Sequence, residues 1–217
     1  MAPHVLLYSR TTAYRHESIP DGIKAFTELG EQHGFTVEAT ELPAAFEGQE
    51  LGRYSAVVFL STSGDVLTDE GRANLASYHR NGGGFMGVHA AACTEYDWPY
   101  YGTLLGARFA RHPPLQPGTL VVEDTGHPAT GHLPRRWDLI DEWYDFRTNP
   151  RSGVRVLATV DEHSYEGGGM PDDHPVMWCH ANGGGPVFYT ALGHTGDAFR
   201  DPLFRSHLWG GLESVME

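Results

Sequence analysis

The stretch Gly82–Ala91, with the sequence GGGFMGVHAA, decides the fold class of this chain. Its apolar residues Phe85–Val88 follow a glycine run and predict a short buried strand. The small residues around His89 have the pattern of a nucleophile elbow, the sharp turn between a strand and a helix that pushes one side chain into a cleft. An elbow normally presents Ser or Cys, and this one presents His89. We therefore expect a strand that ends at His89, with a cleft beside it.

The residues before this stretch alternate between strand and helix patterns. Continuous apolar runs predict buried strands at Val5–Tyr8 and Ala56–Leu60, and alternating residues predict an edge strand at Phe35–Thr40. Apolar residues recur at helical spacing in Ile19–His33, and Thr68 caps a second helix that stops at the Asn-Gly run after Arg80. Strands and helices in this order form right-handed crossovers. We expect an α/β fold with a mostly parallel, doubly wound, flavodoxin-like sheet and helices on both faces.

The second half of the chain is less regular. Pro99–Phe109 is expected to form a short helix, and Pro202–Met216 a closing amphipathic helix. Apolar stretches predict further strands at Thr119–Val122, Trp137–Ile140, Val154–Val160, Pro175–Cys179 and Pro186–Ala191. No linker, low-complexity tract or internal repeat interrupts the 217 residues. The sequence predicts one domain over residues 1–217.

The composition narrows the classes of function. The chain has 15 Lys and Arg against 28 Asp and Glu, a net charge of −13, which argues against binding to nucleic acid or to an anionic membrane. No apolar run approaches the roughly 18 residues of a spanning helix, and the start MAPHVLLYSR lacks the basic region of a signal peptide. Cys93 and Cys179 do not make a disulfide framework. We expect a cytoplasmic protein with a small-molecule ligand, and the sequence leaves homo-oligomerisation open.

Thirteen of the 217 residues are histidine, more than a fold of this class requires. Ligands of open parallel sheets bind outside the carboxyl ends of the strands, so polar residues that follow a strand are candidate site residues. So many ionisable groups at one sheet edge favour a polar cleft over a core. The predicted catalytic residues are His89, His194, Glu142 and His16. The residues expected to contact a substrate are Arg15, Ser61, Thr62, Tyr96, Asp97, Trp98, His112, Tyr144, Arg147 and His180.

Structural roles are alternatives for several of these residues. His89 could be a histidine bonded to a neighbouring loop, and Glu142 a helix cap or half of a salt bridge. The histidines expected to be solvated are His4, His33, His79, His132, His163 and His207, whereas His112, His127 and His174 precede prolines in loops. A zinc-like or iron site built from His89, His180, His194 and Glu142 is chemically allowed, although no local ligand spacing supports one. The glycine runs do not lie between a strand and a helix, so no dinucleotide loop is expected.

Several segments taken together make the chain resemble the ThuA-like family of trehalose-utilisation proteins, within the class I glutamine-amidotransferase-like superfamily. The matching segments are Tyr14–Ile19, Val58–Thr62, Gly82–Ala91, Glu95–Trp98, His112–Pro114, Asp141–Tyr144, His174–Trp178 and Phe188–His194, which span nearly the whole chain. The resemblance implies the superfamily's α/β fold and a link to the catabolism of disaccharides, including oxidised (3-keto) sugars. The amidotransferases carry a nucleophilic Cys at the elbow. His89 stands there instead, so thioester chemistry should be absent, and Cys93 stands where the resemblance leads us to expect an acidic residue.

The residues support two main hypotheses of function. In the first, the protein is an enzyme that acts on a sugar or keto-sugar by isomerisation, elimination or hydrolysis. His89 and His194 would transfer protons, and Glu142 and His16 would orient or polarise the substrate. Tyr96, Trp98 and Tyr144 would stack on the sugar ring. A metal-assisted version differs only in making the histidines ligands.

In the second hypothesis, the protein is a non-catalytic carbohydrate-binding or regulatory module. Concerted acid–base catalysis loses its basis if the side-chain atoms of His89, His194 and Glu142 lie more than about 8 Å apart. A glutamine amidotransferase or cysteine hydrolase, the third option, would need Cys93 or Cys179 at the elbow, and the sequence places neither there.

Overall fold

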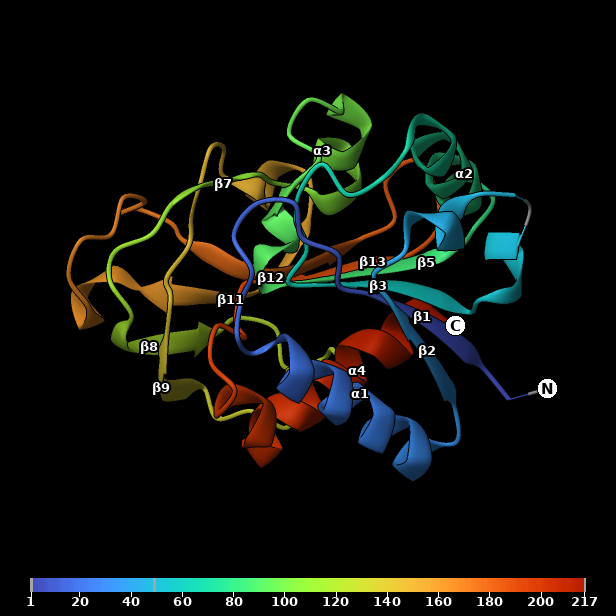
Figure 1. Ribbon diagram of the computed structural model, residues 1–217. Helices are drawn as coiled ribbons and strands as arrows, with labels where there is room; N and C mark the ends of the chain where they lie inside the picture. The colour runs from blue at the N-terminus through green and yellow to red at the C-terminus, as the bar shows by residue number, and fades with distance from the viewer. Residues whose placement is uncertain (1, 49, 217) are drawn as a thin grey trace.

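A computed structural model describes residues 2–48 and 50–216 of the chain. Within these ranges, one mixed sheet of nine strands forms the centre of the fold, in the order β2-β1-β3-β5-β13-β12-β11-β8-β9 (Figure 1). The strands are β1 (His4–Tyr8), β2 (Thr36–Thr40), β3 (Ala56–Leu60), β5 (Gly84–Val88), β8 (Gln116–Val122), β9 (Arg136–Asp141), β11 (Arg155–Asp161), β12 (Pro175–His180) and β13 (Val187–Thr190).

The helices lie on both faces of this sheet. Helices α1 (Ile19–His33) and α4 (Pro202–Met216) lie on one face, and α2 (Asp69–Arg80) and α3 (Pro99–Leu105) lie on the other (Figure 1). Two small sheets pair β4 (Ser63–Gly64) with β6 (Cys93–Thr94) and β7 (Phe109–Arg111) with β10 (Asp145–Phe146). Short 3₁₀ helices complete the chain: η1 (Pro43–Phe46), η2 (Glu50–Arg53), η3 (His89–Ala92), η4 (Pro150–Ser152), η5 (Glu162–Ser164) and η6 (Ala198–Arg200).

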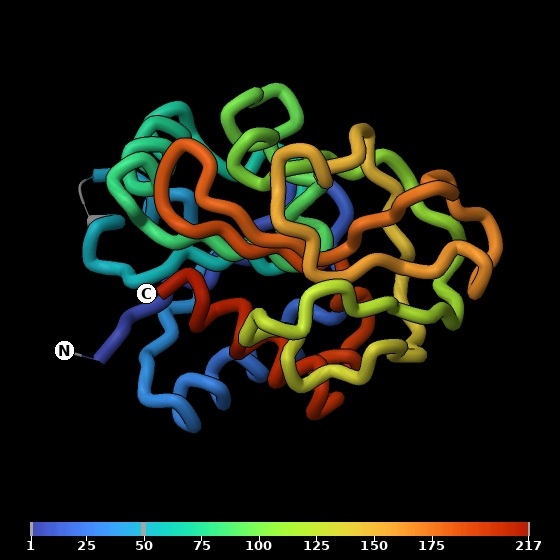
Figure 2. Tube along the Cα trace, turned by 180° about the vertical axis from the view of Figure 1, so that it is seen from behind, coloured from blue at the N-terminus to red at the C-terminus, as the bar shows by residue number. Residues whose placement is uncertain are grey.

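Only part of the sheet is parallel. Strands β2, β1, β3, β5 and β13 run parallel, with β2 at the edge as predicted, whereas β12, β11, β8 and β9 each pair antiparallel with their neighbours. The expectation of a mostly parallel sheet is therefore wrong for the second half of the chain. The reason is the short connection from β12 to β13, residues 181–186, because a parallel pair needs a crossover of a dozen or more residues. Figure 2 shows this hairpin from behind.

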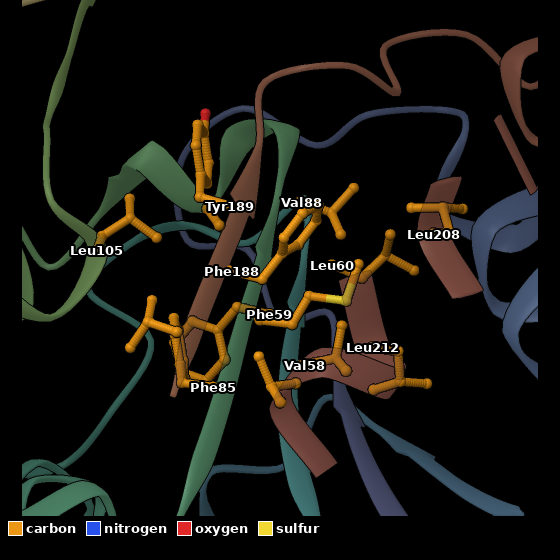
Figure 3. Close-up of a cluster of buried hydrophobic side chains, with 14 of the residues drawn as sticks. Val58, Phe59, Leu60, Phe85, Val88, Leu105, Phe188, Tyr189, Leu208 and Leu212 are labelled. Carbon is orange, nitrogen blue, oxygen red and sulfur yellow. The ribbon is translucent and has the colours of Figure 1, made fainter. Parts of the chain in front are cut away.

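The core lies between the sheet and the helices on each face. Every residue of β3 and β5 is buried, because both faces of these strands are covered. The rings of Phe59 and Phe85 pack edge to face with their centroids 5.1 Å apart, on the side of α3. Figure 3 shows Leu212 of α4 next to Val58 on the other side. Burying one such side chain contributes about 1.5–3 kcal/mol, so these central strands hold the site that follows them rigidly.

The helix boundaries follow from local signals. Helix α1 spans the predicted residues and ends at Gly34, which adopts a left-handed φ of 77°. Thr68 caps α2 by accepting the N–H of Gly71 at 3.1 Å. Helix α3 is shorter than expected and stops at Leu105, because Gly106 adopts a φ of 99°. In the described ranges, no helix combines the length and the apolar character that crossing a membrane requires.

Candidate functional site

His89 occupies a true elbow at the end of β5. Its backbone φ is 51°, in the left-handed region that costs a non-glycine residue about 1–2 kcal/mol, and its side chain is fully buried. Ser61, at the end of the neighbouring strand β3, has a similar φ of 46°. The elbow leads into the 3₁₀ helix η3 instead of an α-helix. Such strain persists where the surrounding structure fixes the residue, so the elbow marks this sheet edge as the candidate site.

The ring of His89 is held in one orientation by its Nδ1 atom. Nδ1 donates a hydrogen bond to the carbonyl oxygen of Ala191, 2.7 Å away, because a carbonyl can only accept. Nε2 therefore carries the lone pair when the ring is neutral. It lies 3.0 Å from Nε2 of His16, 2.9 Å from the hydroxyl of Tyr144 and 3.6 Å from Oε2 of Glu142. The bond to Ala191 is the structural role that the sequence left open for His89, and it uses only Nδ1. Nε2 faces three functional groups.

Glu142 links the remaining histidines to this centre. Its Oε2 atom lies 3.0 Å from Nδ1 of His194, and its Oε1 atom lies 3.5 Å from Nδ1 of His112. Glu142 therefore pairs with two histidines of the site, His194 and His112, and its carboxylate also lies near His89. The distances between His89, Glu142 and His194 are far below the limit of about 8 Å for concerted acid–base work.

Asp141 positions this group, and the sequence analysis did not select it. Its fully buried carboxylate accepts backbone N–H bonds from Glu142 (2.8 Å), Gly193 (2.9 Å) and His194 (3.2 Å). These bonds tie the end of β9 to the loop that follows β13. Burial raises the pKa of Asp141, although the three N–H bonds and His89 oppose that rise. The available signal was the position of Asp141 at the end of a predicted strand, directly before Glu142.

The site groups shift one another's pKa values. Burial, with His89 and His194 adding to it, lowers the pKa of His16 to about 3. Burial alone would raise the pKa of Glu142, but His194 and His89 outweigh it and hold that pKa well below its usual range. The Glu142 carboxylate in turn raises the pKa of His194, against the effect of burial. At neutral pH the site therefore combines a neutral His16, an ionised Glu142 and a His194 that holds a proton more readily than an ordinary histidine.

The same four side chains could hold a metal ion. One ligand atom from each of His16, His89, Glu142 and His194 lies within 4.8 Å of all the others. His180, a predicted contact residue and a member of the metal set that the sequence allowed, does not lie at this cluster. Strand β12 runs antiparallel to β13, so His180 at its end pairs with Val187 at the opposite edge of the sheet. There its Nδ1 accepts the backbone N–H of Asn182 at 3.2 Å.

Of the other predicted contact residues, Tyr144 and His112 lie at the cluster, and Tyr96 and Arg147 lie beside it. The ring of Tyr144 stacks on His89 with centroids 4.4 Å apart. The hydroxyl of Tyr96 donates to the carbonyl of Phe109 at 3.0 Å, and the Arg147 guanidinium lies 4.3 Å from the centre of the Tyr96 ring. Tyr96 is thus linked to Tyr144 through Phe109, whose ring centroid lies 4.5 Å from that of Tyr144.

The remaining predicted contact residues have other partners or surroundings. The Arg15 guanidinium pairs with Glu41 at 2.6 Å, at a half-exposed position. Thr62 is fully buried, and its hydroxyl bonds that of Thr94 at 2.8 Å, so it is structural. The ring of Trp98 packs against those of Tyr100 and Tyr101, and Asp97 is exposed. Ser61 is fully buried, and its hydroxyl has no hydrogen-bond partner among the described residues.

Cys93 lies closer to the site than its position in the sequence suggests, but it is not a nucleophile. Its thiol contacts the hydroxyl groups of Tyr96 and Tyr144, and burial raises its pKa to about 12. A thiol in this state is protonated and inert at neutral pH. Cys93 and Cys179 are both free, as expected.

Two histidines expected to be solvated are buried. His79 bonds the hydroxyl of Tyr100 and the carbonyl of Gly185, and His207 donates to the carbonyl of Ala129. Each ties its helix, α2 or α4, to a carbonyl elsewhere in the chain. The histidines of the site are His16, His89, His112 and His194.

The cluster opens toward His194. His89 and His16 are 0% and 4% exposed, whereas the side chain of His194 is 19% exposed. A surface pocket of about 400 Å³ adjoins His194 and is also lined by Tyr14, Glu17 and Asp21. The exposed ring of Tyr14 meets the ring of His16 edge to face, with centroids 4.8 Å apart. The pocket therefore brings an aromatic surface and carboxylates next to the cluster, and Tyr14 is a second site residue that the sequence analysis did not select.

The fold and the elbow define a glutamine-amidotransferase-like α/β protein with histidine at the nucleophile position. The profile of the ThuA family, described as trehalose utilisation, matches residues 4–214, and the chain belongs to this family. A ThuA-like protein from Bacteroides uniformis is similar, with 26% identity, a TM-score of 0.85 and coverage of 99% of this chain and 92% of that one. A ThuA-like protein from Parabacteroides merdae has 21% identity, a TM-score of 0.83 and coverage of 100% and 90%.

More distant similarity extends to a larger enzyme. The β-galactosidase from Bacillus circulans sp. alkalophilus has 14% identity and a TM-score of 0.61, and the match covers 97% of this chain but 30% of the galactosidase. At this identity the likeness concerns the fold alone. A comparison with curated proteins found no match.

Proposed function

We propose that this protein is an enzyme of sugar catabolism that acts on a disaccharide or a keto-sugar derivative, with His16, His89, Glu142 and His194 as its reaction centre. Membership of the trehalose utilisation family supports a role in sugar metabolism. The observation that carries the proposal is the convergence of three imidazoles and a carboxylate on one point at the elbow. Nothing in the packing of the core requires these polar groups there, and burying them is costly unless they serve the site.

The arrangement suits proton transfer next to a carbonyl or a glycosidic carbon. His89, whose Nε2 carries a lone pair when the ring is neutral, can accept a proton, and His194, which retains its proton more readily than usual, can donate one to a developing alkoxide. The ionised carboxylate of Glu142 lies 3.6 Å from Nε2 of His89 and 3.0 Å from Nδ1 of His194, so it can orient both rings. An isomerisation, an elimination or a hydrolysis each requires such a paired base and acid.

The pocket beside His194 suits a polyhydroxyl ligand. Sugars present an apolar ring face, which the exposed Tyr14 ring can cover, and hydroxyl groups, which Glu17 and Asp21 can accept as hydrogen bonds. His112 lies at the mouth of the cluster, on the other oxygen of Glu142. We therefore assign substrate contact to Tyr14 and His112 in addition to Tyr144.

A screen of disaccharides and their 3-keto derivatives tests this proposal. We expect turnover by the wild-type protein and by His180→Gln, whose histidine lies at the opposite sheet edge. His194→Gln should lose about 10²- to 10⁴-fold in rate, the usual contribution of a positioned acid or base. Sugar binding by calorimetry without any turnover would instead support a carbohydrate-binding module. Turnover that survives both His89→Ala and His194→Gln would contradict the assigned centre.

A further inference from the structure

We propose that His16, His89, Glu142 and His194 bind one divalent first-row transition-metal ion. The inference deepens the proposed function and rests on it for the chemistry of the ion, whereas the ion-binding site itself rests on the geometry alone. The starting observation is that electron pairs face one another at the centre of the cluster. Because Nδ1 of His89 donates to Ala191, a neutral His89 ring directs the lone pair of Nε2 toward Glu142, whose oxygens only accept.

A single proton does not satisfy this arrangement. A proton on one nitrogen can serve one acceptor, but Nε2 of His89 has both Nε2 of His16 and the carboxylate within 3.6 Å. Nδ1 of His194 lies 3.0 Å from the same carboxylate oxygen, so Oε2 of Glu142 faces two imidazole nitrogens. The four ligand atoms lie within 4.8 Å of one another and face a common point between them. A cation at that point satisfies all four at once.

The spacing of the donors matches a coordination sphere. Zinc–nitrogen bonds of about 2.0–2.1 Å place neighbouring ligand atoms about 3.3 Å apart in a tetrahedron, and about 2.9 Å apart in an octahedron. The measured separations are 3.0 Å between His16 and His89, 3.6 Å between His89 and Glu142, and 3.0 Å between Glu142 and His194. Three imidazoles and one carboxylate form a ligand set that suits zinc, iron or nickel better than magnesium or calcium.

The groups behind the donors are those that metal ligands need. A metal-bound histidine normally donates its other ring nitrogen to a carbonyl or a carboxylate, which fixes the ring, and His89 does so through Ala191. The buried carboxylate of Asp141 holds the backbone of both Glu142 and His194. The ligands come from four separate segments, and these bonds hold three of them, His89, Glu142 and His194, in place.

A second cluster in the chain provides an internal comparison. Asp145, Glu162 and His174 also bring ligand atoms within 4.8 Å of one another. It differs from the first cluster because the Arg111 guanidinium already lies 2.8 Å from Oδ2 of Asp145. Glu162 accepts the N–H of Met170 at 2.6 Å and lies 2.8 Å from His174. A cation of the protein itself therefore balances the charge of this second cluster, and we place no metal ion there.

An ion at the first cluster changes the roles of the histidines. Their coordinating nitrogens would no longer carry protons, and the ion would polarise a sugar carbonyl or hydroxyl that enters from the pocket beside His194. The hydroxyl of Tyr144, 2.9 Å from Nε2 of His89, then becomes the nearest proton donor.

The test measures metal binding without turnover. Full-length protein is treated with chelator, and the apo form is titrated with Co²⁺ and Zn²⁺ by calorimetry, with visible absorption of Co²⁺ as a reporter of coordination. We expect one ion per chain. His16→Gln and His194→Gln should weaken binding by more than the roughly 10- to 100-fold that follows loss of an outer partner. His180→Gln should bind like the wild type, and circular dichroism verifies that each variant is folded.

Two results would overturn the site: absence of binding by folded apo protein, or equal affinity of the wild type, His16→Gln and His194→Gln. Sugar turnover is then compared for apo and reloaded protein. Binding of one ion without turnover of any sugar would refute the proposed function and support the metal site. Turnover by protein that binds no ion would refute the metal site and support the proposed function.

Discussion

The left-handed backbone of His89 predicts an inversion of the usual stability order of alanine and glycine. We compare His89→Ala with His89→Gly in chelated protein. Both variants lose the bond to Ala191 and the stack on Tyr144, so those losses cancel. Alanine keeps the strain of a φ of 51°, worth about 1–2 kcal/mol, and glycine does not. Glycine lowers the free energy of unfolding by about 0.4–1 kcal/mol relative to alanine, because its unfolded chain has more conformational entropy.

The net expectation is that His89→Gly is more stable than His89→Ala by about 0.5–1 kcal/mol. For a chain of this size, this corresponds to a difference in Tm of about 1–4 °C. Urea unfolding at equal m-values measures it. Ala76→Gly in α2 is the control, and it should destabilise by about 1 kcal/mol, in the usual direction. Equal stability of the two His89 variants, or greater stability of His89→Ala, would refute the elbow geometry.

Three further predictions concern the surroundings of the elbow. Glu95→Gln should destabilise the fold by about 2–3 kcal/mol in urea unfolding and leave metal affinity unchanged, because the buried carboxylate pairs with a partly exposed Arg72 at 2.7 Å. In apo protein, Glu142→Gln should lower the pKa of His194, measured by NMR of its ring. Folding raises the pKa of His194 and depresses that of Glu142. Glu142→Gln should therefore lower the free energy of unfolding most between about pH 4 and pH 6.5, where the wild-type carboxylate and imidazolium are both charged. This loss of stability should fade as the pH rises above the raised pKa of His194. Tyr144→Phe should reduce sugar turnover about 10²- to 10⁴-fold and keep the bound ion, so unchanged turnover would remove its role as proton donor.

The parallel half of the fold could be predicted from the sequence, and the antiparallel half could not. Strands β1, β3 and β5 are covered on both faces, so their sequences are continuous apolar runs with clear ends. The apolar stretch that forms β12 does not show whether this strand runs parallel or antiparallel to β13. Only the six residues between it and β13 indicate a hairpin, and without that signal His180 was placed at the wrong edge.

The position of residues after strands predicted the core of the site. His16, His89, Glu142 and His194 come together as expected, since each follows a strand that ends at the same edge. The role of Asp141 was not predictable, because β9 lies four strands from β13 in the sheet order. The antiparallel half curls so that the last residue of β9 meets the loop after β13, and this curvature arises from tertiary packing that no local pattern encodes.

The most direct test of the account is an anomalous diffraction measurement on crystals of the protein soaked with Zn²⁺, recorded above and below the zinc absorption edge. The account predicts one strong peak at bonding distance, about 2.0–2.2 Å, from the donor atoms of His16, His89, Glu142 and His194. A map with no peak at the elbow, or with its strongest peak at Asp145, Glu162 and His174, would contradict it.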